Sequence, residues 1–121
     1  MRSRADDVDS DGRAAHLDLP SADQIEVAVH ALSLLADPTR LRLLWLCATA
    51  EHDVGRLAVL AGTTPAAASQ HLAKLRLAGL VSVRHHGRRH LYSTRGGHVA
   101  RLVREALSYA DHQLSGAPPH P

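Results

Sequence analysis

Cysteine and aromatic residues are scarce in this sequence. Cys47 is the only cysteine among 121 residues, which excludes an intramolecular disulfide and a cysteine-rich metal site. Because it lies in the apolar run LLWLCA, we expect a buried, small hydrophobic side chain. There is no phenylalanine, and only one tryptophan and two tyrosines are present. We therefore expect a mainly helical fold with a core of leucine, valine and alanine, and we place the lone Trp45 in that core.

Long apolar runs and catalytic motifs are also missing. No apolar stretch is long enough to span a bilayer, and the acidic, polar N-terminus does not resemble a signal peptide, so we expect a cytoplasmic protein without membrane contact. The sequence contains neither a Gly-rich phosphate loop nor a nucleophile in a recognisable setting. A chain of this length forms one modest core without a deep pocket, so we do not expect an enzyme.

Acidic residues are absent between Thr64 and Arg95, although the formal net charge of the whole chain is only +2. An acid-free segment rich in basic residues is typical of a surface that binds a polyanion. The basic residues of the segment are Lys74, Arg76, Arg84, Arg88, Arg89 and Arg95.

Residues 54–93 contain the pattern of a DNA-binding element. VGRLAVLAG predicts a short helix, TTPAAASQHLAKLRLAGLV a second helix, and VSVRHHGRRHLYS a β-hairpin. Thr64 suits an N-cap and Pro65 the first helical position, while Leu72, Leu75 and Leu80 supply an apolar face. Two helices joined by a tight turn and followed by a basic hairpin indicate a winged helix-turn-helix.

The remaining chain divides into an arm, two further helices, a last helix and a tail. Residues 1–20 predict a disordered N-terminal arm, residues 21–115 the DNA-binding and dimerisation domain, and residues 116–121 a flexible tail. Within the domain, one helix begins at a cap on Ser21 or Asp23 and the next at Asp37-Pro38. We expect Gly96-Gly97 to break the hairpin before the last helix, which closes near Gly116. The expected order is four helices, two strands and a fifth helix.

Glu51, His52 and Asp53 form a polar break before the helix-turn-helix. Consecutive residues on a loop rarely converge on one metal ion. We therefore expect a solvated connection at this point.

In this order and spacing, three motifs resemble the ArsR/SmtB family of transcriptional repressors. They are LADPTRLRLLWLC in the second helix, SQHLAKLRLAGLV in the recognition helix and RHHGRRHLYS in the wing. The resemblance covers about residues 23–114. It implies a homodimer built on the first and last helices, with two recognition helices in successive major grooves of a near-palindromic double-stranded operator. It also implies release from DNA when a metal ion binds.

Candidate DNA contacts lie on the recognition helix and the wing. Thr64, Ser69 and Gln70 match positions that contact DNA in the family, and the Gln70 amide suits bidentate pairing with adenine. The alternative is an ordinary solvated basic face. The expected phosphate contacts on the helix are His71 and Lys74. The wing residues Arg88, Arg89 and His90 are expected to contact the backbone or an adjacent minor groove.

The family's cysteine metal site has no counterpart here. Its pattern ELCVCDL aligns with EHDVGRL, so that Asp53 and Gly55 stand where the thiolates would be. We therefore expect no arsenic, cadmium or lead site of that kind.

The last helix offers different metal ligands. His98 and His112 are separated by about 21 Å along the helix, which is too far to share an ion within one chain. The two histidines lie only about 40° apart around the helix axis, so they are on the same face of the helix. If the helix packs antiparallel against its two-fold mate, His98 of one subunit meets Asp111 and His112 of the other.

This trio resembles the nickel/cobalt-sensing, KmtR-like branch of the family. Imidazole and carboxylate without thiolate suit Ni²⁺ or Co²⁺, with Zn²⁺ as the alternative. Gly96 and Tyr109 depart from the Asp-x-His and His-x-x-His patterns of other zinc and nickel sensors in the family. The candidate ligands are therefore His98, Asp111, His112 and His120, with His16 or His30 as possible additions.

The sequence also fits a regulator that binds DNA but no metal ion. The two histidines of the last helix also fit polar ends of an amphipathic helix, and His112 in the last turn favours the helix dipole. The chain would then be a winged-helix regulator without a metal site, controlled by a partner protein or constitutive. A protein-interaction module without DNA fits the acid-free basic segment less well.

Overall fold

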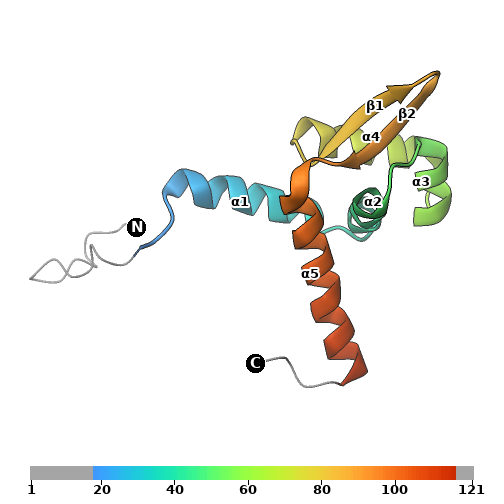
Figure 1. Cartoon of the computed structure of the whole chain (residues 1–121). Helices are drawn as coiled ribbons and strands as arrows, with labels where there is room; N and C mark the ends of the chain where they lie inside the picture. Colours follow the sequence, from blue (N-terminus) through green and yellow to red (C-terminus); the bar gives the residue numbers. More distant parts are fainter. Residues whose placement is uncertain (1–17, 117–121) are drawn as a thin grey trace, which may run out of the picture.

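The computed structural model describes residues 18–116 and confirms the predicted order of elements (Figure 1). His16, His120 and most of the predicted arm and tail lie outside these residues. The elements are α1 (Ala22–Leu35), α2 (Pro38–Thr49), α3 (Val54–Ala61), α4 (Pro65–Leu77), β1 (Val81–His86), β2 (Arg89–Thr94) and α5 (Gly96–Ser115).

The first four helices begin where the sequence places capping residues. The Ser21 side chain accepts a hydrogen bond from the backbone N–H of Gln24 in a capping box, which decides between the two candidate caps of α1. The cap residues of the next three helices are Asp37, Asp53 and Thr64, and each accepts a hydrogen bond from the backbone N–H three residues on.

The predicted start of the last helix was slightly wrong. The strand β2 ends at Thr94, just before the two glycines, but Gly96 and Gly97 already belong to the first turn of α5. Gly96 has a φ of 74°, in the left-handed region that only glycine adopts at little cost. The sharp change of direction between β2 and α5 is thus made inside the helix's first turn.

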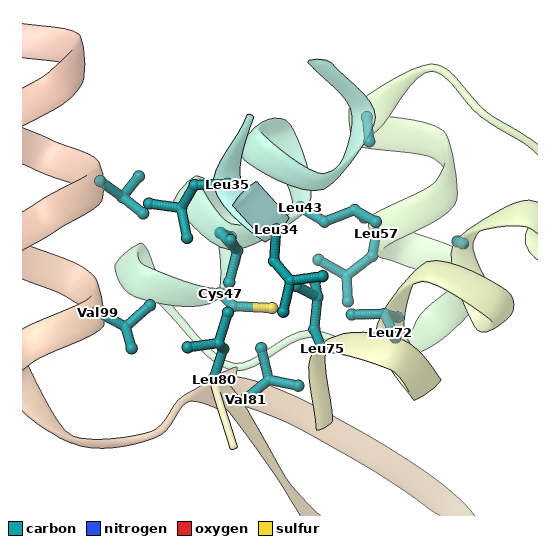
Figure 2. Packing of buried hydrophobic residues seen from close by; sticks show 14 of the residues in the cluster. Leu34, Leu35, Leu43, Cys47, Leu57, Leu72, Leu75, Leu80, Val81 and Val99 are labelled. Atoms are coloured by element: carbon teal, nitrogen blue, oxygen red, sulfur yellow. The ribbon is translucent and has the colours of Figure 1, made fainter. Parts of the chain in front are cut away.

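The hydrophobic core forms around α2, which contacts all four other helices and β2. Leu43, Leu44 and Cys47 of α2 are buried against leucines and valines from the other elements (Figure 2). The leucine-rich composition and the burial of Cys47 are confirmed. Burial raises the pKa of the Cys47 thiol to about 12, so the side chain stays neutral and unreactive at neutral pH.

The placement of Trp45 in the core was wrong, because its side chain is 42% exposed. The buried face of α2 is formed by Leu43, Leu44 and Cys47. These residues and Trp45 are all apolar, so the composition of the helix does not fix which of them face inward. Contacts with the surrounding elements therefore select the buried face.

Trp45 instead lines an apolar groove with a volume of about 670 Å³. Leucines of α2, α3 and α5 form much of the lining, with the α1–α2 junction at one end; they are Leu41, Leu46, Leu60 and Leu107. The groove is open at the surface.

Helices α1 and α5 extend away from the body formed by α2, α3, α4 and the hairpin (Figure 1). Only Leu34 and Leu35, at the C-terminal end of α1, are buried. Both helices carry exposed apolar side chains: Ile25, Val27, Val29 and Leu32 on α1, and Leu102, Tyr109 and Leu114 on α5. None of the helices in residues 18–116 is long and apolar enough to cross a membrane.

Candidate nucleic-acid interface

Helix α4 presents two chemically different faces. Ala68, Leu72 and Leu75 are buried against the core. Ser69, Gln70 and Lys74 are exposed, as is the cap residue Thr64, so four of the predicted DNA-contact residues lie at the surface of one helix and its N-terminus. The helical period therefore separates the groups that dock the helix from the groups that are available to a ligand.

His71 lies between these two faces. Its side chain is half-buried, and its charge helps to hold the pKa of Asp37 below the ordinary value, although the hydrogen bond from the Arg40 backbone N–H is the main cause. Its neighbourhood therefore includes the first turn of α2. The predicted phosphate contact of His71 stays a prediction, from a position less open than that of Lys74.

The wing is a two-stranded antiparallel hairpin with its basic residues at the surface. His86 pairs with Arg89 at the tip and Val81 with Thr94 at the base, and the turn uses Gly87 with a φ of 64°. His85 and His90 are cross-strand partners whose rings lie 4.3 Å apart between centroids, tilted by 44°. The predicted contact residues Arg88, Arg89 and His90 are all exposed.

Two arginines of the wing are bound by carboxylates from the α2–α3 loop. Arg84 donates from Nε to one oxygen of Glu51 at 3.0 Å and from its terminal nitrogen to the other at 2.8 Å. Arg89 donates from Nε to Asp53 at 3.1 Å, and its terminal nitrogen lies 3.1 Å from the same oxygen. The segment from Thr64 to Arg95 contains no acidic residue, but the fold places the carboxylates of Glu51 and Asp53 against two of its arginines.

The expectation of a solvated connection at residues 51–53 was incomplete: Glu51 is exposed and His52 and Asp53 are half-buried, but the connection is also bonded to the hairpin. His52 forms a β-bridge with Tyr92 through the backbone: the N–H of His52 donates to the carbonyl of Tyr92 at 3.2 Å, and the N–H of Tyr92 donates to the carbonyl of His52 at 2.8 Å. Together with the two ion pairs, this bridge fastens the loop to the hairpin. Sequence reasoning missed the arrangement because the paired residues are 33 and 36 positions apart.

The pKa values of both loop carboxylates are lowered. The Arg84 guanidinium lowers the pKa of Glu51, and Glu51 raises that of Arg84. The pKa of Asp53 is lowered chiefly by the hydrogen bond from the Arg56 backbone N–H and then by Arg89. Asp53 therefore has two roles, as the N-cap of α3 and as the partner of the wing.

The candidate metal ligands of the last helix lie along α5. His98 is exposed in its first turn, while Asp111 is exposed and His112 half-buried near its end. Within residues 18–116, no three histidine, cysteine, aspartate or glutamate side chains of one chain are grouped so that they could hold a metal ion. His30 is exposed on α1.

His98 has a cationic neighbour. A terminal nitrogen of Arg101 lies 3.0 Å from His98 Nδ1. Because a guanidinium only donates hydrogen bonds, Nδ1 acts as the acceptor and its lone pair is engaged. A metal ion binding at Nδ1 would have to displace Arg101.

Comparisons with known proteins identify relatives over about four fifths of this chain. A helix-turn-helix domain family matches residues 35–84. The transcriptional regulator KmtR of Mycobacterium tuberculosis is 41% identical over 98 residues, which cover 81% of this chain and 75% of that protein. A transcriptional repressor SmtB homologue of Synechocystis is 38% identical over 100 residues, covering 83% and 74%.

A solved structure shows the same fold. The homodimeric winged helix-turn-helix domain of Mb0332 from Mycobacterium bovis, described as a possible ArsR-family regulator, superposes with a TM-score of 0.73. The sequences are 30% identical, and the match covers 87% of this chain and 99% of that one. The sequence relatives and the winged-helix geometry agree: the chain belongs to the ArsR/SmtB family of DNA-binding transcriptional repressors and is KmtR-like.

Proposed function

We propose that two copies of this chain bind a near-palindromic DNA operator through α4 and the wing. The observation that carries the proposal is the exposed polar face of α4, which has the basic hairpin beside it and no acidic residue of its own. Ser69 and Gln70 read base edges in the major groove, while Lys74 and the wing arginines contact the phosphate backbone.

A homodimer is proposed because one winged helix buries too little surface for tight, specific binding, and two-fold symmetry doubles the contact. The exposed apolar side chains of α1 and α5, with the groove around Trp45, supply surface for a second copy. The homodimeric state of the Mycobacterium bovis domain supports this arrangement.

DNA binding is tested by titrating the purified chain with duplexes from its own promoter and with random duplexes of equal length. We expect preference for the promoter and a steep decrease in affinity with salt, because phosphate contacts release counterions. Equal affinity for the two duplexes would contradict sequence-specific recognition.

We further propose that Ni²⁺ or Co²⁺, with Zn²⁺ less favoured, binds between the α5 helices of the dimer and releases the DNA. His98 of one protomer with Asp111 and His112 of the other would hold the ion, and His120 lies outside the described residues. The donor set fits, since imidazole nitrogen and carboxylate oxygen suit these ions. Bound metal would favour one arrangement of the α5 pair, and DNA another.

The alternative is a regulator without metal, in which His98 is a polar residue of α5 that contacts Arg101. The two possibilities are separated by titrating the DNA complex with each metal, for the wild type and for His98→Ala and His112→Ala. The proposal predicts release in the wild type and its loss in both variants. Failure of all three metals to release wild-type DNA would support the metal-free alternative, whereas release that survives both substitutions would place the site elsewhere.

A further inference from the structure

Asp53 and a DNA phosphate require the same hydrogen-bond donors. Arg89 stands at the start of β2, beside the tip of the wing, and its side chain remains 59% exposed while it pairs with Asp53. Both Nε and one terminal nitrogen point at a single carboxylate oxygen. A phosphate oxygen would use these nitrogens in the same way. Arg89 must therefore break one or both of its contacts with Asp53 before these nitrogens can bind a DNA phosphate.

The neighbouring arginine provides a contrast. Arg88 occupies the turn beside Arg89 and is also exposed, yet within residues 18–116 it has no carboxylate partner. Of these two adjacent arginines, only Arg89 has a carboxylate from the described part of the chain held against it. Asp53 is held firmly in place, because its other oxygen caps α3 by accepting from the Arg56 N–H at 2.9 Å.

We infer that Asp53 is an intramolecular competitor for the DNA backbone, a positioning residue that restrains Arg89 in the free protein and lowers the affinity of the wing for any duplex. This inference rests on the proposed contact between the wing and DNA. The acid acts on phosphate binding and not on base reading, so it lowers the affinity for promoter and random duplexes alike.

Asp53→Asn tests the inference without removing the helix cap, since asparagine is as good an N-cap as aspartate. We expect about a two- to fivefold gain in affinity for both duplexes, the range typical of an exposed ion pair. The logarithmic slope of affinity against salt should become steeper by less than about 0.9, the value for one whole phosphate contact, because Arg89 already contacts the backbone in the wild type.

The matched control is Asp37→Asn, which makes the same change at the N-cap of α2, where the carboxylate has no partner on the wing. This variant should gain less affinity than Asp53→Asn, and its effect should be the same with and without Arg89, because Asp37 interacts with His71 of α4 and not with the wing. The decisive comparison repeats Asp53→Asn in an Arg89→Ala background, where the gain should vanish because the arginine that is released no longer exists.

The outcomes separate this inference from the proposed function. A wild type that binds no DNA overturns the proposed function together with this inference. A wild type that binds DNA with unchanged or lower affinity after Asp53→Asn overturns this inference alone. A gain that persists in the Arg89→Ala background also overturns it, because the effect would then be general repulsion between the acid and DNA.

Discussion

At the scale of single residues, the partners of a side chain decide its role more than its type does. Arg84, Arg88 and Arg89 are equivalent in the sequence, yet two of them are held by carboxylates of the α2–α3 loop. Gln70 and Leu72 are two positions apart on one helix, and one is exposed while the other is buried. The candidate DNA interface therefore consists of the polar side chains that are exposed and can bind DNA in place of their partners within the chain.

Substitutions of Gln70 and Arg88 should separate base reading from backbone binding. Gln70→Ala removes an amide that suits adenine, so we expect a loss of about 1–3 kcal/mol on the promoter duplex and little change on random duplexes. Arg88→Ala should weaken both and flatten the dependence on salt. Equal losses on the two duplexes for both variants, measured by fluorescence anisotropy, would contradict this division.

Arg89→Ala is expected to weaken binding to all sequences as well, but by less than Arg88→Ala. Its positive charge is already partly offset by Asp53 in the free protein. Anisotropy titrations of the two variants at the same salt concentration compare them directly. A larger loss for Arg89→Ala would indicate that the ion pair with Asp53 does not reduce the contribution of Arg89.

At the scale of elements, α4 shows how one helix combines docking and recognition. Its inner face is fixed in the core, and its cap Thr64 and first residue Pro65 set where it begins. The wing is fixed differently, through the bridge between His52 and Tyr92 and the two ion pairs. Helix α4 is therefore positioned by its buried face, whereas the wing is positioned partly by Arg89, one of its own exposed candidate contact residues.

Leu72→Ala should destabilise the fold by about 2–5 kcal/mol, because the side chain is fully buried and its removal leaves a cavity. Leu77→Ala is the matched control on the same helix, where the side chain is 92% exposed, and should change the free energy of unfolding by less than about 0.5 kcal/mol. Urea denaturation followed by circular dichroism, at one protein concentration, measures both. Similar losses would contradict the observed orientation of α4.

The cap of α2 should contribute a dependence of stability on pH. The pKa of Asp37 is lowered in the folded chain, mainly by the Arg40 N–H, so the carboxylate stabilises the fold above its ordinary pKa of about 3.9. That stabilisation is lost as the pH falls through the folded pKa. An asparagine side chain caps the helix at every pH, so Asp37→Asn should lose less stability between pH 6 and pH 3 than the wild type in urea titrations. An identical loss in both proteins would contradict the linkage.

At the scale of the whole molecule, the single chain leaves apolar surface without cover. Exposed apolar side chains lie along α1 and α5 and around the groove beside Trp45. A continuous apolar surface of this kind is typical of a site that binds another protein. A second copy would remove this surface from water and set two recognition helices at a fixed separation. Binding to a two-fold symmetric operator depends on that separation.

The lone tryptophan reports on this assembly. We expect the emission maximum of Trp45 to shift to the red on dilution from micromolar concentration, as dimers dissociate and the indole becomes exposed to water. Val29→Asp places a charge on the apolar face of α1, where Val29 is exposed, and should weaken the dimer by about tenfold or more without unfolding the chain. Sedimentation of a monomer at micromolar concentration in the wild type would contradict the dimer.

The sequence by itself determined the order of the elements, because caps, prolines and apolar periodicity are local signals that act within one or two turns. It carried the recognition helix too far, since α4 ends at Leu77 and Leu80 lies in the turn before β1. It also determined the family, through three motifs in fixed order, and the outward residues of α4. Tertiary structure alone decided which face of α2 is buried, since Leu43, Leu44 and Trp45 are all apolar and only the neighbouring elements distinguish them. It likewise decided that Glu51 and Asp53 bind the wing, because an ion pair between residues more than 30 positions apart depends on the packing that brings them together.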